Sequence, residues 1–262
     1  LQSVSKSFTS ALVGIAMESG EFKGVDEKML DFFTQAEREK ISNMDERKAS
    51  IRLKDLLTMR SGTDYHESGP DSPHFKLNAL RTGWDKFYLD RPMKTEPGTT
   101  FLYDSGAVII TSTLLKNRTG MHADEYAQRY LFNPLQITNT FWFKNSEGHP
   151  HTGGGLNLAP LDTAKLGQLY LDLGRWKGKQ VVPEAWVRES AKQHVTFDGN
   201  RGHVKGYGYW WWILEHDRRV EGDQDIYAAM GFKAQYIFVI PEHDMVVVVN
   251  GDTRTGTDQR KP

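Results

Sequence analysis

The chain has 262 residues, of which 38% are hydrophobic and 26% are charged, and its formal net charge is −1. This length is enough to bury a full core, in one large domain or in two lobes. The balanced charge gives no sign of nucleic acid or of an anionic membrane as a partner. The chain contains no cysteine, which excludes disulfides, thiol catalysis and thiolate metal sites. No apolar run approaches the roughly 18 residues that a membrane span needs.

The first two thirds of the chain are predicted to be mostly helical. Residues 3–18 place apolar side chains at helical spacing, as one buried stripe, and Gly20 is a suitable stop. Charged, helix-compatible stretches occupy residues 21–60, and the Ser-, Gly-, Asp- and Pro-rich segment 60–73 predicts a loop. Further helices are predicted over residues 106–118, 123–132, 162–172 and 183–192.

The last third changes to aromatic and β-branched runs, which favour strands. These runs are residues 207–213, 234–240 and 245–250, and a turn at residues 241–244 predicts that the last two form a hairpin. The pattern is a helix in front, a helical middle and a β-rich end.

A possible nucleophile stands at the start of the first helix. Ser3-Val-Ser-Lys6 is an S-x-x-K motif, and residues three apart share one helix face, so the Lys6 amine can reach the Ser3 hydroxyl. A serine hydroxyl needs a neighbouring base, and an amine serves as one only where its surroundings disfavour its charge. Taken alone, this spacing is more often a solvated helix start than an active site.

The residues around the S-x-x-K motif are more informative than its spacing alone. The run Ser-Val-Ser-Lys-Ser-Phe-Thr, followed by Ala-Leu-Val-Gly-Ile-Ala, resembles the active-site helix of the β-lactamase and penicillin-binding-protein superfamily. Within it, the chain is most similar to class C β-lactamase-like esterases and 6-aminohexanoate-dimer (nylon-oligomer) hydrolases. Matches in the same order continue along nearly the whole chain, including residues 56–62, 96–105, 154–162 and 207–211.

The resemblance implies roles for several residues. Tyr103 occupies the tyrosine position of a Tyr-x-Ser motif, where it would relay protons, and Ser105 takes the third position. Ser105 could also cap the helix that follows it. Tyr65 resembles a substrate-contacting tyrosine of the nylon-oligomer hydrolases, although the composition of its loop favours a plain surface position.

The third family motif differs from that of the lactamases. Ala229-Met-Gly231 stands where they have Lys-Thr-Gly, so the side chains that bind a β-lactam carboxylate are missing. Backbone donors survive such a change, and the resemblance places the N–H groups of Ser3 and Phe232 in the oxyanion hole. It also assigns substrate binding to Ser105, Gly231, Tyr65 and Gln235. Lys233 could replace the lost lysine only in a shifted register.

The fold implied by the resemblance is α/β (α+β), with an antiparallel sheet flanked by helices and a mostly helical insertion. Residues 1–20 and 166–262 are expected to form the α/β lobe, and residues 21–165 the helical lobe that carries the Tyr-x-Ser motif. Family members place strands and a helix before the nucleophile and a helix after the last strand. We therefore expect such terminal elements to be missing here, which would leave a sheet edge open and Ser3 near a frayed start.

The expected activity is acyl transfer to water through an acyl-enzyme, on small carboxylic esters or amides. Catalytic roles fall to Ser3, Lys6 and Tyr103, with no metal or organic cofactor and no nucleic-acid partner. Alternatives are a β-lactamase or D-amino-acid peptidase, or a catalytically silent homologue that binds a ligand. The superfamily favours a periplasmic or secreted location over a cytoplasmic one. His149 and His151 are expected to be solvent-exposed rather than metal ligands, because no third ligand accompanies them.

Overall fold

The computed structural model describes residues 1–198, 202–215 and 225–251. Its helices are α1 (Ser5–Glu18), α2 (Gln35–Arg38), α3 (Glu46–Ser50), α4 (Leu53–Leu57), α5 (Pro73–Ala79), α6 (Trp84–Leu89), α7 (Ser105–Thr119), α8 (Ala123–Ala127), α9 (Pro160–Leu171) and α10 (Glu184–Ser190). Short 3-10 turns occupy Gln2–Val4, Met29–Phe32 and Pro241–His243, and a π-helical turn, Gln128–Phe132, continues α8.

The strands of the described residues form one large antiparallel sheet and two small ribbons. The large sheet has the order β10-β9-β8-β7-β6-β5, and β1 pairs with β2 as β3 does with β4. Their bounds are β1 (Phe141–Trp142), β2 (Leu156–Asn157), β3 (Arg175–Trp176), β4 (Lys179–Gln180), β5 (Val195–Thr196), β6 (Val204–Tyr207), β7 (Trp212–Leu214), β8 (Ile226–Gly231), β9 (Gln235–Ile240) and β10 (Met245–Asn250). A mixed fold with an antiparallel sheet and a helical insertion is therefore confirmed.

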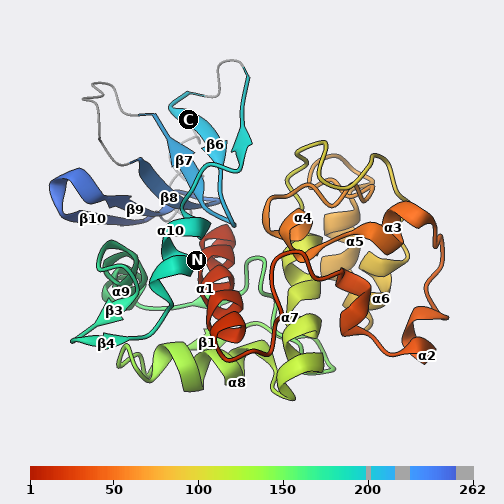
Figure 1. Cartoon of the computed structure of the whole chain (residues 1–262), viewed down its shortest axis with the longest axis horizontal. Coiled ribbons are helices and arrows are strands. Elements are labelled where there is room, and N and C mark those ends of the chain that lie inside the picture. The colour runs from red at the N-terminus through yellow and green to blue at the C-terminus, as the bar shows by residue number, and fades with distance from the viewer. Residues whose placement is uncertain (199–201, 216–224, 252–262) are drawn as a thin grey trace, which may run out of the picture.

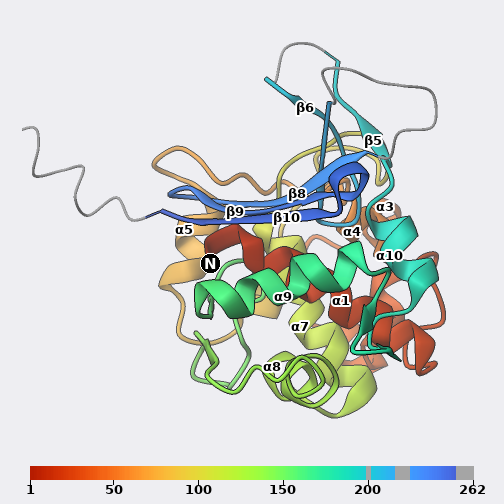
Figure 2. The ribbon, with the colours of Figure 1, turned by 90° about the vertical axis from the view of Figure 1, so that its left-hand side faces the viewer.

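The sheet lies against helices α1 and α9, with α10 beside them, and most of the remaining helices lie farther from it (Figures 1 and 2). Most of the helices from α2 to α7 gather beside α1, at the right of Figure 1, whereas α8 lies below it. The predicted hairpin is confirmed, since β9 and β10 pair from Met245↔Ile240 to Asn250↔Gln235. β10 forms one edge of the sheet.

The helix α1 is buried on all sides, so the single buried stripe predicted for it is wrong. Every residue from Ser5 to Ala16 is buried, polar ones included. The hydroxyl of Ser7 satisfies its hydrogen bonding by donating to the carbonyl of Trp210 at 2.7 Å. At Gly14 a Cβ atom would lie 2.3 Å from the Trp186 ring, so glycine allows α10 to pack closely. A helix enclosed in this way holds its first turn firmly.

The aromatic run at residues 207–213 is divided between two strands. β6 ends at Tyr207 and β7 begins at Trp212, and Trp210 adopts a positive φ of 60° in the turn between them. The turn is fixed because the Trp210 indole N–H donates to the carbonyl of Leu56 at 3.0 Å. Packing against α4 therefore overrides the strand propensity of the run.

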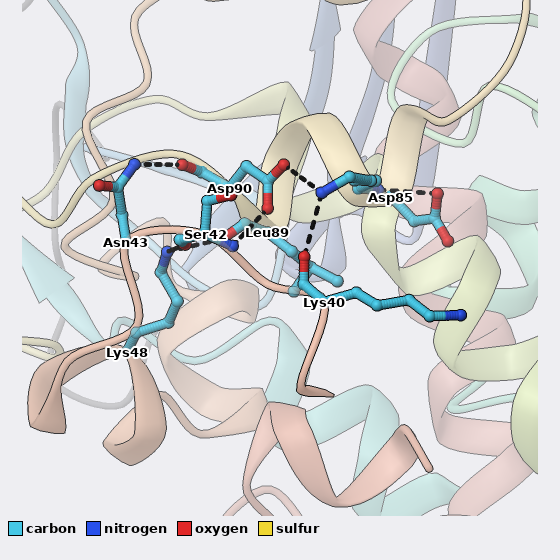
Figure 3. A network of polar contacts seen from close by, with 8 residues as sticks. Lys40, Ser42, Asn43, Lys48, Asp85, Leu89 and Asp90 are labelled. Carbon is cyan, nitrogen blue, oxygen red and sulfur yellow. Dashed lines mark hydrogen bonds and ion pairs between the residues drawn. The ribbon is translucent and has the colours of Figure 1, made fainter. Parts of the chain in front are cut away.

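A buried lysine fastens the segment before α3 to the end of α6 (Figure 3). The Lys48 amine donates to the carbonyls of Leu89, at 2.6 Å, and Ser42, at 3.1 Å. The Asp90 carboxylate accepts from the Ser42 N–H at 2.7 Å, and the Asp90 carbonyl accepts from the Asn43 amide at 2.9 Å. These bonds replace the water that the buried polar groups have lost.

Candidate functional site

The S-x-x-K motif forms the hydrogen bond that its spacing predicts. Ser3 lies in the 3-10 turn Gln2–Val4 that leads into α1, and Lys6 lies in the first turn of α1. The Lys6 Nζ is 2.7 Å from the Ser3 Oγ, and the Lys6 side chain is only 1% exposed. The site therefore pairs a half-buried hydroxyl with a buried amine.

The second partner of Lys6 was not identified from the sequence. Its Nζ donates to the carbonyl of Gly153 at 2.6 Å, in the Gly153-Gly-Gly155 segment. A Cβ atom on Gly153 would lie 3.1 Å from the Ser105 carbonyl oxygen and 3.2 Å from its Cβ, tighter than ordinary van der Waals contact. The run of three glycines was the available signal in the sequence for a close backbone approach.

Tyr103 lies beside the same amine. The Lys6 Nζ is 4.9 Å from the centroid of the Tyr103 ring. That ring stacks on Trp212, with centroids 5.6 Å apart and planes inclined by 17°, and meets Tyr207 edge-on at 6.5 Å. The strands β6 and β7 thus orient the tyrosine toward α1. The three residues expected to be catalytic are brought together from two distant parts of the chain.

The end of strand β8 meets the backbone of Leu1 and Ser3. A Cβ atom built on Gly231 would lie 2.6 Å from the Leu1 carbonyl oxygen and 3.2 Å from the Ser3 nitrogen. In the turn that follows, Lys233 and Ala234 both have positive φ, 64° and 55°, a strained conformation for residues other than glycine. N–H groups in the first turn of a helix lack intrahelical acceptors, so the Ser3 N–H can serve a ligand.

A cavity of about 790 Å³ opens at Ser3, within the size range of ligand pockets. Its lining residues are Leu1, Gln2, Ser3, Glu67, His74, Phe75, Asn78, Ser105, Phe141, Phe143, His151, Gly153, Gly154, Gly155, Asn157 and Phe232. A second hollow of about 820 Å³ beside α8 shares Phe141 and Phe143 but does not reach Ser3. The chemistry therefore belongs to the first cavity.

Ser105 lines this cavity, and it is not the cap of its helix. The cap of α7 is Asp104, whose carboxylate accepts from the Ala107 N–H at 3.0 Å. The N–H of Ser105 instead donates to Oε1 of Glu67 at 2.6 Å. Glu67 was not identified from the sequence, where it lies in a polar loop without any motif.

Three of the four predicted substrate-binding residues, Tyr65, Gly231 and Gln235, lie outside the lining. Tyr65 is fully buried, and its hydroxyl is 3.2 Å from Nδ1 of His74, which does line the cavity. It is therefore not the surface-loop residue that its surroundings favoured. The Gln235 side chain donates to the carbonyls of Lys233 and Gly251, at 3.0 and 2.6 Å. Lys233 is exposed in the turn and does not line the cavity either.

The prediction of an exposed His151 is wrong. Its side chain is buried, lines the cavity, and places Nε2 2.8 Å from Oδ1 of Asn78. The Asn78 amide nitrogen is in turn 3.0 Å from Nε2 of His74. Burial, with Lys6 nearby, lowers the pKa of His151 to about 4, and burial also lowers the pKa of His74. Both rings are neutral at neutral pH.

Asp104, between the two residues of the Tyr-x-Ser motif, is a buried carboxyl. Its Oδ2 accepts from the Tyr88 hydroxyl at 2.9 Å and from the Ser61 hydroxyl at 3.3 Å. Removal from water raises its pKa from 3.8 to about 7, although the Ala107 N–H and the Tyr88 hydroxyl act in the opposite direction. The group supports the helix α7 that presents Ser105.

Two further findings concern the described part of the chain as a whole. None of its helices combines the length and the apolar character needed to cross a membrane. Histidine and carboxylate side chains do not come together in groups of three or more that could hold a metal ion, at least among the described residues.

Two known proteins have sequences similar to that of this chain. The "6-aminohexanoate-dimer hydrolase" of Paenarthrobacter ureafaciens is 22% identical over 95% of this chain and 64% of that protein. The "Unguisins hydrolase ungD" of Aspergillus violaceofuscus is 25% identical over 53% of this chain and 24% of that protein. The chain thus spans less than two thirds of the length of either relative.

A solved structure shares the fold. "EstCE1, a hydrolase with promiscuous acyltransferase activity" superposes with a TM-score of 0.76 at 16% identity, over 95% of this chain and 78% of its own. The family model for beta-lactamase matches residues 1–261. The chain therefore belongs to the beta-lactamase family of hydrolases.

Proposed function

We propose that this chain is a serine hydrolase that cleaves small carboxylic esters or amides through an acyl-enzyme on Ser3. The observation that carries the proposal is the contact of 2.7 Å between the Lys6 Nζ and the Ser3 Oγ at the wall of the cavity. A buried amine at hydrogen-bond distance from a hydroxyl is the arrangement that makes serine nucleophilic.

In the first half-reaction, the Lys6 amine accepts the Ser3 hydroxyl proton while Oγ bonds to the substrate carbonyl carbon. The carbonyl oxygen becomes an oxyanion, which the N–H groups of Ser3 and Phe232 stabilise. The Tyr103 hydroxyl gives a proton to the leaving alcohol or amine and is reprotonated from Lys6. The carbon–leaving-group bond then breaks and the acyl-enzyme remains.

In the second half-reaction, water attacks the acyl carbon and loses a proton to the same Lys6 and Tyr103 pair. The Ser3 Oγ leaves as the hydroxyl, and the carboxylic acid is released. Hydrolysis of β-lactams or D-amino-acid peptides is the weaker candidate, because Ala229 and Met230 stand in place of the Lys and Thr of the lactamase motif. The names of both curated relatives describe hydrolases, which agrees with the proposal.

Turnover of p-nitrophenyl acetate and butyrate by wild type and Ser3→Ala tests the nucleophile. We expect the substitution to lower kcat/KM by at least about 10³-fold, because it removes the hydroxyl that the Lys6 Nζ contacts at 2.7 Å. A fluorophosphonate probe should label the wild type at Ser3 and leave Ser3→Ala unlabelled. Ser19→Ala, which removes a hydroxyl at the other end of α1, is the matched control and should retain full activity.

Equal rates for wild type and Ser3→Ala would contradict the proposal. A chain that turns over neither ester and reacts with no probe would instead be a catalytically silent homologue.

A further inference from the structure

The cavity carries one formally charged side chain among its lining residues in the described part of the chain. That side chain is Glu67, and it is half-buried. Its Oε1 accepts the Ser105 N–H at 2.6 Å, which fixes the carboxylate at the wall. Its Oε2 has no hydrogen-bond partner among the described residues, so it can accept from a ligand.

No lining side chain in the described ranges offsets this charge. His74 and His151 are both neutral at neutral pH, because burial lowers their pKa values. Lys233 is exposed in the turn after β8, with Nζ 5.9 Å from the centroid of the Phe232 ring, and it does not line the cavity. A substrate carboxylate in the cavity would therefore meet the Glu67 carboxylate, and none of the described lining side chains carries a positive charge to receive it.

The aromatic part of the wall favours the same kind of ligand. Phe75, Phe141, Phe143 and Phe232 line the cavity and are 58%, 61%, 49% and 72% exposed. The faces of aromatic rings attract cations and cover hydrocarbon chains. Glu67 and these rings are independent features, and each suits an organic cation on an apolar stem.

We propose that Glu67 selects substrates by charge, so that the preferred esters or amides carry an ammonium group on an apolar chain and those carrying a carboxylate are rejected. This inference rests on the proposed function, since it names the substrate class for acylation at Ser3. Glu67 acts here as a specificity residue and takes no part in bond making or breaking.

Two series of esters test the preference, because the structure does not decide whether the acyl or the alcohol part meets Glu67. The first comprises p-nitrophenyl esters of 6-aminohexanoate, heptanoate and adipate, which are cationic, neutral and anionic. The second comprises butyrate esters of choline, 3,3-dimethylbutanol and 4-hydroxybutyrate. Wild type should show a cation-to-anion ratio of kcat/KM of about 10 or more in at least one series.

Glu67→Gln removes the charge but keeps an oxygen that can accept the Ser105 N–H. We expect it to lower the cation-to-anion ratio about 10-fold in the series that shows the preference. Each kcat/KM value for a charged ester is divided by that for the neutral ester of the same series, which corrects for any general loss of activity in the variant. Asp71→Asn is the matched control, because it makes the same charge change on a side chain that is 92% exposed and outside the cavity. It should leave the ratio unchanged.

A preference for the anionic ester in wild type, or a ratio that Glu67→Gln leaves unchanged, would overturn the inference. Failure of the proposed function is recognised separately, by equal turnover of the neutral ester by wild type and Ser3→Ala. In that case the affinities of Ser3→Ala for hexylamine and hexanoate, measured by calorimetry, test whether the cavity selects ligands by charge. Tighter binding of the amine, lost on adding Glu67→Gln, supports charge selection, and equal binding of the two ligands overturns it.

Discussion

Two buried lysines stand in contrasting surroundings. Lys6 and Lys48 are each 1% exposed, and each donates to a backbone carbonyl at 2.6 Å. The other partner of Lys48 is again a carbonyl, whereas that of Lys6 is the hydroxyl of Ser3. Lys48 faces the loop and helix that it joins, as Figure 3 shows, whereas Lys6 contacts Ser3, the proposed nucleophile, at a cavity wall.

The comparison shows that burial of a lysine does not by itself identify a catalytic group. Burial lowers the pKa of Lys48, while Asp45 and Asp90 oppose that change, and yet its amine donates to the carbonyl oxygens of Leu89 and Ser42. Function depends on what the amine meets: carbonyl oxygens have no proton to give, and a serine hydroxyl does.

Replacing each lysine with methionine separates the two roles and has the largest expected effect. Lys6→Met should lower ester kcat/KM by about 10³-fold or more, because the general base is lost. Lys48→Met should lower the free energy of unfolding by about 2 to 3 kcal/mol, because the carbonyls of Leu89 and Ser42 lose their donor. Kinetics per folded molecule and urea denaturation measure the two effects. Equal losses of activity in Lys6→Met and Lys48→Met would contradict the assignment of a catalytic role to Lys6 and a structural role to Lys48.

A smaller effect is expected from Gly231→Ala, which disturbs the catalytic region without changing any charge. The new Cβ atom would lie 2.6 Å from the Leu1 carbonyl oxygen and 3.2 Å from the Ser3 nitrogen, so the Ser3 backbone must shift. We expect kcat to fall roughly 10- to 100-fold, as happens when an oxyanion-hole donor is displaced. Unchanged kcat with lowered stability would show that β8 supports the helix α1 and not the oxyanion.

The last prediction concerns the pH dependence of stability and the buried carboxyl of Asp104. Its pKa is 3.8 in the unfolded reference and about 7 in the folded chain, so the folded state binds more protons between these values. Its stabilising contribution is therefore complete below pH 4 and declines as the pH rises to 7. Asp104→Asn should flatten this decline in denaturation curves recorded from pH 4 to 8. If stability declines as steeply with pH in Asp104→Asn as in wild type, the decline arises from other titratable groups.

Local patterns along the chain identified the three longest helices of the described residues, α1, α7 and α9, and the central pair of the site. Lys6 reaches Ser3 because they lie three residues apart at the start of a helix, which is a property of the sequence alone. Predicted helices at residues 106–118 and 162–172 match α7 and α9 closely, since apolar spacing and turn residues mark them. The division into lobes at residues 20 and 166 and the roles of individual residues remain predictions.

The rest of the site is decided by contacts between distant segments. Glu67 reaches the cavity by bonding to Ser105, 38 residues away, and Gly153 meets Lys6 across 147 residues. His151 appeared to belong to an exposed loop until packing beside Asn78 enclosed it. Hydrophobic periodicity reports which face of an element is buried, but it carries no information about which loops meet there. The sequence therefore determined the contact between Lys6 and Ser3, and only the tertiary structure decided the wall that a substrate would meet.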